Sequence, residues 1–177
     1  MVATLVGMRT VVLGVDDLEA LIARRRASGA DLFDEVWEGT YHVAPAPTAA
    51  HALLDTRLTI LLDPYAQAAH LEGTGPFNLG VQDNFRVPDH GYHRGEPVGT
   101  WVPTAAIVVE ILSPDDETFD KFGFYAAAGV DELIIVDPAE RLIRCFRRDG
   151  DGYAEAARSD LLGVSSPELT TRLNWPA

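Results

Sequence analysis

The sequence predicts an α/β fold, in which a mixed β-sheet is flanked by helices. Residues 105–112, AAIVVEIL, form an almost continuous apolar run, which is typical of a central strand covered on both faces. Residues 132–137, ELIIVD, form a second apolar run, and the segment between the two runs has the acidic start and glycine end of a helix. A strand–helix–strand unit with further amphipathic segments on either side predicts helices on the faces of a sheet.

The N-terminal part of the chain is predicted to form a helix, a hairpin and a longer helix. Residues 16–27 carry apolar residues at helical spacing behind aspartates that can cap the first turn. The segment LFDEVWEGTYHVA is predicted to form two strands around a turn at Glu38-Gly39. Thr48 is predicted to cap a helix whose leucines keep helical spacing until Pro64 interrupts or restarts it.

The rest of the chain is predicted to alternate between strands and helices. FNLGVQDNFRVPD carries strand signals split by polar residues, whereas residues 90–104 are dense in glycine and proline, which predicts a loop. Ser113-Pro114 ends the central strand, and a helix is expected over 115–129. The strands RLIRCFRR and YAEAA and a short helix around 166–173 complete the predicted order.

Length and composition indicate one domain over residues 1–177, soluble and located in the cytoplasm. No apolar run is long enough to cross a membrane, and the chain begins without the basic segment of a signal peptide. Cys145 is the only cysteine and is expected to be a small core residue. The net charge of −13 opposes nucleic-acid binding, and the arginine clusters at 24–26 and 141–148 are more typical of solvated faces than of a phosphate track.

Lys121 is the only lysine among fourteen cationic side chains, and the others are all arginine. Lysine supplies a compact, movable charge with a tunable pKa, which arginine cannot replace. The structural alternative is an exposed helix position, where Lys121 pairs with Glu117 four residues earlier and where its removal costs little stability. Tyr125, one turn further along the helix, is expected in the core or in a groove wall.

Glu110 is the only polar residue in its apolar run, and Asp89 follows a proline at the end of the preceding strand. A buried carboxylate is costly, so Glu110 must be protonated, paired, near solvent or bound to a metal. If both acids meet Lys121 at one end of the sheet, the carboxylates can hold Mg²⁺ or Mn²⁺, which prefer oxygen ligands. The lysine can then neutralise the charge that develops during phosphodiester hydrolysis.

The segments VPD, PTAAIVVEILSPDDETFDK and YAAAGVDELIIVDP resemble the Uma-type restriction-endonuclease family, a branch of the PD-(D/E)xK nuclease-like superfamily. The likeness extends from about residue 32 to residue 148 and implies a restriction-endonuclease-like fold. The resemblance implies that Asp89 and Glu110 are the metal-binding acids and that Lys121 is the catalytic lysine. Glu38 and His51 stand where the family tends to show similar residues, with less defined roles.

Two positions depart from the pattern of the wider superfamily. Its lysine lies two residues after the acid, a place held here by Leu112, and in the Uma-type branch the lysine has moved to the helix. His90 follows Asp89 where an apolar residue is more typical. His90 and His93 also form a His-x-x-His pattern that can bind zinc, although solvated histidines fit a loop of this composition.

Two functions follow from these observations. The first is a metal-dependent endonuclease, a hydrolase that uses Mg²⁺ or Mn²⁺ to cleave DNA. The alternative is a non-catalytic homodimeric protein-interaction module that keeps the nuclease-like fold, with Glu110 merely buried and paired. The acids and the lysine favour the enzyme, whereas the net charge favours the module.

Overall fold

The structure is a computed structural model that describes residues 15–114 and 117–176. Its strands are β1 (Glu35–Trp37), β2 (Thr40–His42), β3 (Glu72–Thr74), β4 (Asn78–Val81), β5 (Asn84–Arg86), β6 (His90–His93), β7 (Trp101–Val102), β8 (Ile107–Ile111), β9 (Glu132–Asp137), β10 (Leu142–Asp149), β11 (Gly152–Ala156), β12 (Arg158–Ser159) and β13 (Val164–Ser165). Its helices are α1 (Val15–Ser28), α2 (Ala49–Ala68), the 3₁₀ turn η1 (Thr118–Lys121), α3 (Phe122–Ala127) and α4 (Ser166–Arg172).

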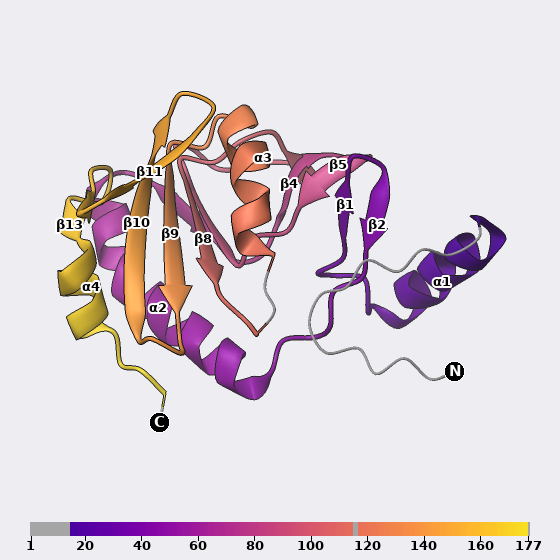
Figure 1. The fold of residues 1–177 in the computed structure, drawn as a ribbon, viewed down its shortest axis with the longest axis horizontal. Helices are drawn as coiled ribbons and strands as arrows, with labels where there is room; N and C mark the ends of the chain where they lie inside the picture. The colour runs from indigo at the N-terminus through magenta and orange to yellow at the C-terminus, as the bar shows by residue number, and fades with distance from the viewer. Residues whose placement is uncertain (1–14, 115–116, 177) are drawn as a thin grey trace.

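These strands form two larger sheets and a small ribbon. The six-stranded sheet has the order β11-β10-β9-β8-β6-β3, the five-stranded sheet has the order β2-β1-β5-β4-β7, and β12 pairs with β13. β8 and β9 are parallel, whereas β6 and β10 run antiparallel to them. This mixed architecture with helices confirms the predicted fold class (Figure 1).

The six-stranded sheet is covered on both faces, with α2 on one side and α3 on the other (Figure 1). The buried leucines of α2 pack with Val109 and Ile111 of β8 in one core cluster. Tyr125 of α3 packs with Val108 in a second cluster on the opposite face. Because side chains alternate along a strand, Glu110 shares the face of Val108 and points toward α3.

Helix α2 begins at the predicted cap and continues further than predicted. The hydroxyl of Thr48 accepts a hydrogen bond from the backbone N–H of His51 at 3.2 Å, which confirms the cap. The helix runs through Pro64 to Ala68, although a proline inside a helix removes one hydrogen bond. The buried stripe of Leu54, Leu58, Leu62 and Ala66 continues past the proline, so packing holds the last turn in place.

Two predicted elements differ from those in the structure. Residues 90–104, predicted as a loop, contain β6 and β7. β6 lies between β3 and β8, and this pairing depends on residues that are distant in the sequence. Residues 115–116 of the helix predicted over 115–129 lie outside the described residues; within the described ones, a 3₁₀ turn, η1, precedes α3, which ends at Ala127.

Helix α1 lies beyond the β1–β2 hairpin, on the side away from the six-stranded sheet (Figure 1). Arg25 connects it to the body of the protein, since its guanidinium donates to both carboxylate oxygens of Asp34 and to the carbonyl of Ala44. Within the described ranges, no helix is both long and apolar enough to cross a membrane.

Gly80 of β4 provides a test of this packing. Its φ is +126°, and an added Cβ would lie 2.4 Å from the carbonyl oxygen of Asn84 and 2.9 Å from Cζ of Phe124. We therefore expect Gly80→Ala to lower the free energy of unfolding by about 2 kcal/mol or more in urea titrations. Gly123→Ala in α3 is the matched control, because its Cβ meets nothing within 4 Å. The control should leave stability unchanged or raise it by up to about 1 kcal/mol, and equal stability of both variants would contradict the described backbone at Gly80.

Candidate active site

A cavity of about 660 Å³ opens where β8 and β9 end, and we call it the carboxylate cavity. Most of its wall is apolar, and alanines and prolines of residues 44–50 supply much of it. Its charged lining contains more acids than bases: Glu35, Asp55, Asp89, Glu110 and Glu117 against Lys121 and Arg141, with His51 beside them. Four of the residues predicted from the sequence thus lie around one cavity, namely Asp89, Glu110, Lys121 and His51.

The pairing of β6 with β8 brings Asp89 beside Glu110. His90 pairs with Val109, so Asp89, just before β6, lies opposite Glu110 of β8. The backbone N–H of Ile111 donates to Oδ2 of Asp89 at 2.8 Å. His51, in the first turn of α2, has its Nε2 3.0 Å from Oδ1 of Asp89. Each oxygen of the Asp89 carboxylate therefore has a hydrogen-bond partner.

Lys121 is buried between two carboxylates. Its Nζ donates to Oε1 of Glu110 at 3.1 Å and to Oε1 of Glu35 at 2.9 Å, and only 6% of the residue is exposed. The expectation of an exposed helix position is therefore wrong. The 3₁₀ turn η1 ends at Lys121 and directs the ammonium into the protein, toward the end of β8.

Glu35, the first residue of β1, is the acid that sequence reasoning missed. Its Oε1 accepts the Lys121 hydrogen bond and one from the backbone N–H of Val87 at 2.8 Å, and its Oε2 accepts from Nε1 of Trp37 at 2.6 Å. Glu38, the residue predicted from the sequence, lies exposed in the β1–β2 turn and does not line the carboxylate cavity. The sequence signal for Glu35 was only an acid at the start of an alternating strand, which does not reveal what packs against it.

Burial and neighbouring charges change the protonation of the site. Burial raises the pKa of Glu110 to about 7, Lys121 opposes this rise, and Asp89 and Glu35 add to it. Burial disfavours the charge of Lys121, but the two carboxylates outweigh it and raise the pKa of the lysine. Lys121 is thus a permanent cation near neutral pH, whereas Glu110 is the acid that can exchange a proton there.

The two oxygens of Glu110 have different surroundings. Oε1 accepts hydrogen bonds from Lys121 and from the hydroxyl of Tyr125, which is fully buried. Oε2 has no hydrogen-bond partner in the part of the chain that the structure describes, and Glu110 lines the carboxylate cavity. One oxygen is therefore used by the protein, and the other remains open to a ligand.

This donor set fits a hard divalent cation. Carboxylate oxygens are the ligands that Mg²⁺ prefers, and the surplus of acids in the carboxylate cavity favours a bound cation. Residues 15–114 and 117–176 contain no cluster of three or more His, Cys, Asp or Glu side chains arranged around a metal position. Mg²⁺ is commonly held by one or two carboxylates, with water and phosphate oxygens as its other ligands. Asp89 and Glu110 match that smaller set.

His90 and His93 do not form the zinc pair that their spacing allows. Residues three apart on a strand point to opposite faces. His90 contacts Asp55 on α2, whereas Nε2 of His93 lies 3.1 Å from Oγ1 of Thr74. Both histidines are 4% exposed, so the alternative of solvated side chains is also wrong.

Three of the arginines, Arg94 after β6 and Arg147 and Arg148 on β10, are paired with acids. Arg94 and Arg148 contact the carboxylate of Asp131, and Arg147 contacts Asp160 at 2.8 Å. Their positive charge is therefore largely offset where it occurs, as expected for a solvated face rather than for a phosphate track.

Comparison with known proteins agrees with this architecture. The family model Uma2, described as a putative restriction endonuclease, matches residues 16–176. One similar solved structure is described as a putative nuclease belonging to DUF820 from Anabaena variabilis. It has a TM-score of 0.64 and 16% sequence identity, and the match covers 78% of this chain and 89% of that chain. At this identity the likeness supports the fold alone. No curated protein matches the chain.

Lys121→Met tests the charge balance of the site. Removing the ammonium leaves two buried carboxylates, so we expect the free energy of unfolding at pH 8 to fall by about 3–5 kcal/mol relative to wild type. Without Lys121 the pKa of Glu110 in the folded protein rises further above its value in the unfolded chain. The contribution of Glu110 to stability is then full at low pH and is lost as the pH rises through the folded pKa. The loss should therefore be smaller at pH 6 than at pH 8.

The unfolding free energy of the double variant Lys121→Met/Glu110→Gln should not fall between pH 6 and pH 8 as that of Lys121→Met does, because the glutamine cannot take up the proton. Urea unfolding of both variants and the wild type at each pH measures it. A cost for Lys121→Met below about 1 kcal/mol, equal at both pH values, would indicate a surface lysine instead.

Proposed function

This chain belongs to the Uma2 family of restriction-endonuclease-like proteins, and on that premise we propose that it is a Mg²⁺-dependent nuclease that hydrolyses phosphodiester bonds of DNA. The observation that carries the proposal is the convergence of Asp89, Glu110 and Lys121 on one cavity, with Lys121 bonded directly to Glu110. Charged groups that converge in a cleft with a strongly shifted carboxyl pKa are typical of functional sites.

In this proposal Asp89 and Glu110 hold the Mg²⁺, or Mn²⁺ in its place. The bound cation would lower the pKa of a coordinated water and polarise the phosphoryl group. Lys121 keeps its proton because its pKa is raised, so its role is to stabilise negative charge rather than to act as a base. His51 orients Asp89, and Tyr125 orients Glu110.

A specific observation also favours the alternative, a non-catalytic homodimeric interaction module. Glu110 is already paired with Lys121 and hydrogen-bonded by Tyr125, so its Oε1 is satisfied without a metal. The net charge of −13 is also easier to reconcile with a protein partner than with DNA. Activity measurements on site variants decide between the two functions.

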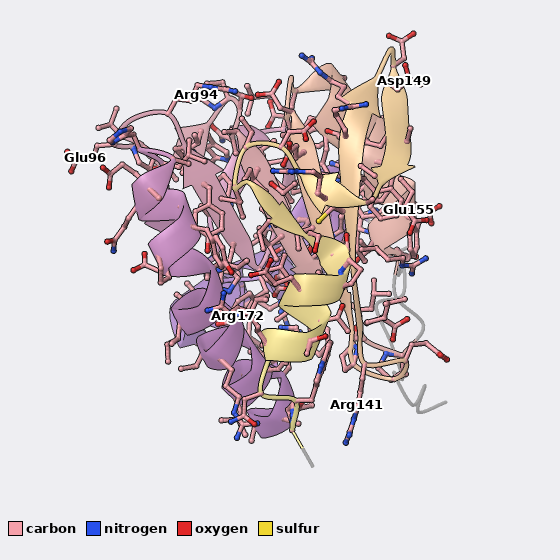
Figure 2. The ribbon with its side chains drawn as sticks, turned by 90° about the vertical axis from the view of Figure 1, so that its left-hand side faces the viewer. Arg94, Glu96, Arg141, Asp149, Glu155 and Arg172 are labelled. Carbon is pink, nitrogen blue, oxygen red and sulfur yellow. The ribbon has the colours of Figure 1, made fainter. Side chains whose placement is uncertain are left out.

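We expect wild-type protein to cleave DNA in Mg²⁺ and not in EDTA. Asp89→Asn and Glu110→Gln should lower the cleavage rate roughly a hundredfold or more, because charge stabilisation at the phosphate is lost. Lys121→Arg should be strongly impaired, since a planar guanidinium replaces a compact ammonium. Glu155→Gln on β11 is the matched control for Glu110→Gln, because Glu155 is exposed and lies outside the carboxylate cavity (Figure 2).

Glu35→Gln and Glu38→Gln, assayed side by side, decide which of the two acids belongs to the site, and we expect only Glu35→Gln to lose activity. Plasmid and single-stranded DNA are the substrates, and circular dichroism checks each fold. Full cleavage by Glu110→Gln would refute the assigned site. No cleavage by any form on a broad substrate panel would favour the interaction module.

Mg²⁺ binding is expected to stabilise the folded protein, because the cation binds an arrangement of carboxylates that the unfolded chain lacks. At a hundredfold excess over the dissociation constant the gain is about 2.7 kcal/mol. Thermal unfolding with increasing Mg²⁺ or Mn²⁺ measures it, and Asp89→Asn should abolish the shift. An equal shift in Asp89→Asn would place the cation elsewhere.

A further inference from the structure

We propose that the substrate enters the carboxylate cavity as an unpaired nucleic-acid strand, with a base against Trp175 and a phosphate near Arg141 and Arg57. This inference rests on the proposed nuclease function and specifies its substrate. It is carried by the C-terminal segment, by the lining of the cavity and by the charge of the protein.

Two arginines hold the C-terminal segment at the cavity. Trp175 lines the cavity, and its Nε1–H donates to the carbonyl of Thr170 at 2.9 Å. The carbonyl before it, on Asn174, accepts from Nη1 of Arg57 at 2.8 Å, and the carbonyl after it, on Pro176, accepts from Nη2 of Arg141 at 3.1 Å. Two guanidinium groups, from α2 and from the β9–β10 turn, therefore bind the backbone on either side of Trp175.

Arg141 occupies a backbone conformation that arginine seldom adopts. Its φ is +48°, in the left-handed region that favours glycine or asparagine. The turn before it is held by Asp137, whose Oδ1 accepts from the backbone N–H groups of Ala139 and Glu140. Arg141 also lines the cavity. It places a positive charge there although its backbone conformation favours glycine or asparagine.

The size and the lining of the cavity fit a single nucleotide unit. Sites for small ligands commonly have volumes of about 300–1,000 Å³, and this cavity has about 660 Å³. An apolar wall with an aromatic ring matches the face of a base, and such stacking accepts every base. In a duplex the bases are stacked on one another, so a base reaches this wall only after leaving the stack. A strand that is already unpaired avoids that cost.

The charge of the protein also favours a single strand over a duplex. Duplex DNA releases more counterions per phosphate contact than a single strand, which reflects its higher charge density. A chain with a net charge of −13 therefore repels a duplex more strongly. Arg147 and Arg148, near the end of β10 that Asp149 marks, are paired with acids and lie at the opposite end of the molecule from Arg141 (Figure 2). The described surface there offers no unpaired basic track for a double helix.

Binding of labelled probes tests the proposal. The probes are a short oligothymidine, its RNA counterpart of oligouridine, and a blunt DNA duplex of the same length, in low salt with Ca²⁺ replacing Mg²⁺ and each probe verified intact on a gel. Fluorescence anisotropy should show at least about tenfold tighter binding of an unpaired strand than of the duplex. The two single strands show whether the site prefers DNA or RNA.

Variants locate the contact. Trp175→Ala should weaken strand binding about tenfold, which lies within the range for loss of one base–aromatic stack. Trp175→Phe should retain most of the binding, and Arg141→Gln should weaken it. The matched controls are Trp101→Phe, at an exposed tryptophan on β7, and Arg147→Gln, at an exposed arginine on β10. Both controls should bind like wild type. If Trp175→Ala fails to fold, the strand binding of Arg141→Gln compared with that of Arg147→Gln tests the proposal.

The outcomes separate this inference from the proposed catalysis. Duplex binding equal to or tighter than strand binding, strand binding unchanged in the Trp175 and Arg141 variants, or no binding of any probe would overturn the inference. Metal-dependent cleavage of duplex plasmid with no strand preference would leave the nuclease proposal intact and remove only the substrate assignment. Strand binding that depends on Trp175 and Arg141, without cleavage, would support the strand site and refute the catalysis.

Discussion

The buried ammonium of Lys121 is the contact on which the rest of the site depends, because it joins three parts of the fold. It binds Glu35 on the five-stranded sheet and Glu110 on the six-stranded sheet, and it lies at the start of α3. A cation at the N-terminal end of a helix is unfavourable by itself, since the helix dipole is positive there. The two carboxylates offset both this effect and the desolvation of the lysine. The buried charge of Lys121 therefore depends on both carboxylates.

The same arrangement leaves the carboxylate cavity short of positive charge. Lys121 is shared between Glu35 and Glu110, while Asp89 is fixed by His51 and a backbone amide. The hydrogen bond to Asp89 raises the pKa of His51 more than its burial lowers it, which partly offsets the surplus. On the surface, by contrast, arginines of β10 are paired with nearby acids. The cavity therefore keeps an excess of acids, to which a divalent cation or a substrate can respond.

A carboxylate needed only for structure would gain by having both oxygens hydrogen-bonded, because an unmade hydrogen bond to a buried polar group is costly. Glu110 instead uses Oε1 for both of its hydrogen bonds. This division suits a group that is held rigidly on one side and remains available on the other. Structural pairing and chemistry are therefore compatible roles for Glu110, and the pairing supplies the preorganisation that a catalytic carboxylate needs.

The sequence by itself determined the elements whose signals are local. The apolar runs predicted β8 and β9, the Thr48 cap predicted the start of α2, and the order of Asp89, Glu110 and Lys121 pointed to the family that the comparison confirms. Patterns of this kind report what lies within a few residues along the chain, which is enough to assign strands, caps and motifs.

Only the tertiary structure decided which residues complete the site. Glu35 is 86 residues from its partner Lys121, and Trp175 is placed by arginines of α2 and of the β9–β10 turn. β6 became a strand because β3 and β8 pair with it, although its own segment has the composition of a loop. The burial of Lys121 likewise depends on which acids pack against it. These contacts join segments that are far apart in the sequence, and local periodicity carries no information about which distant segments meet.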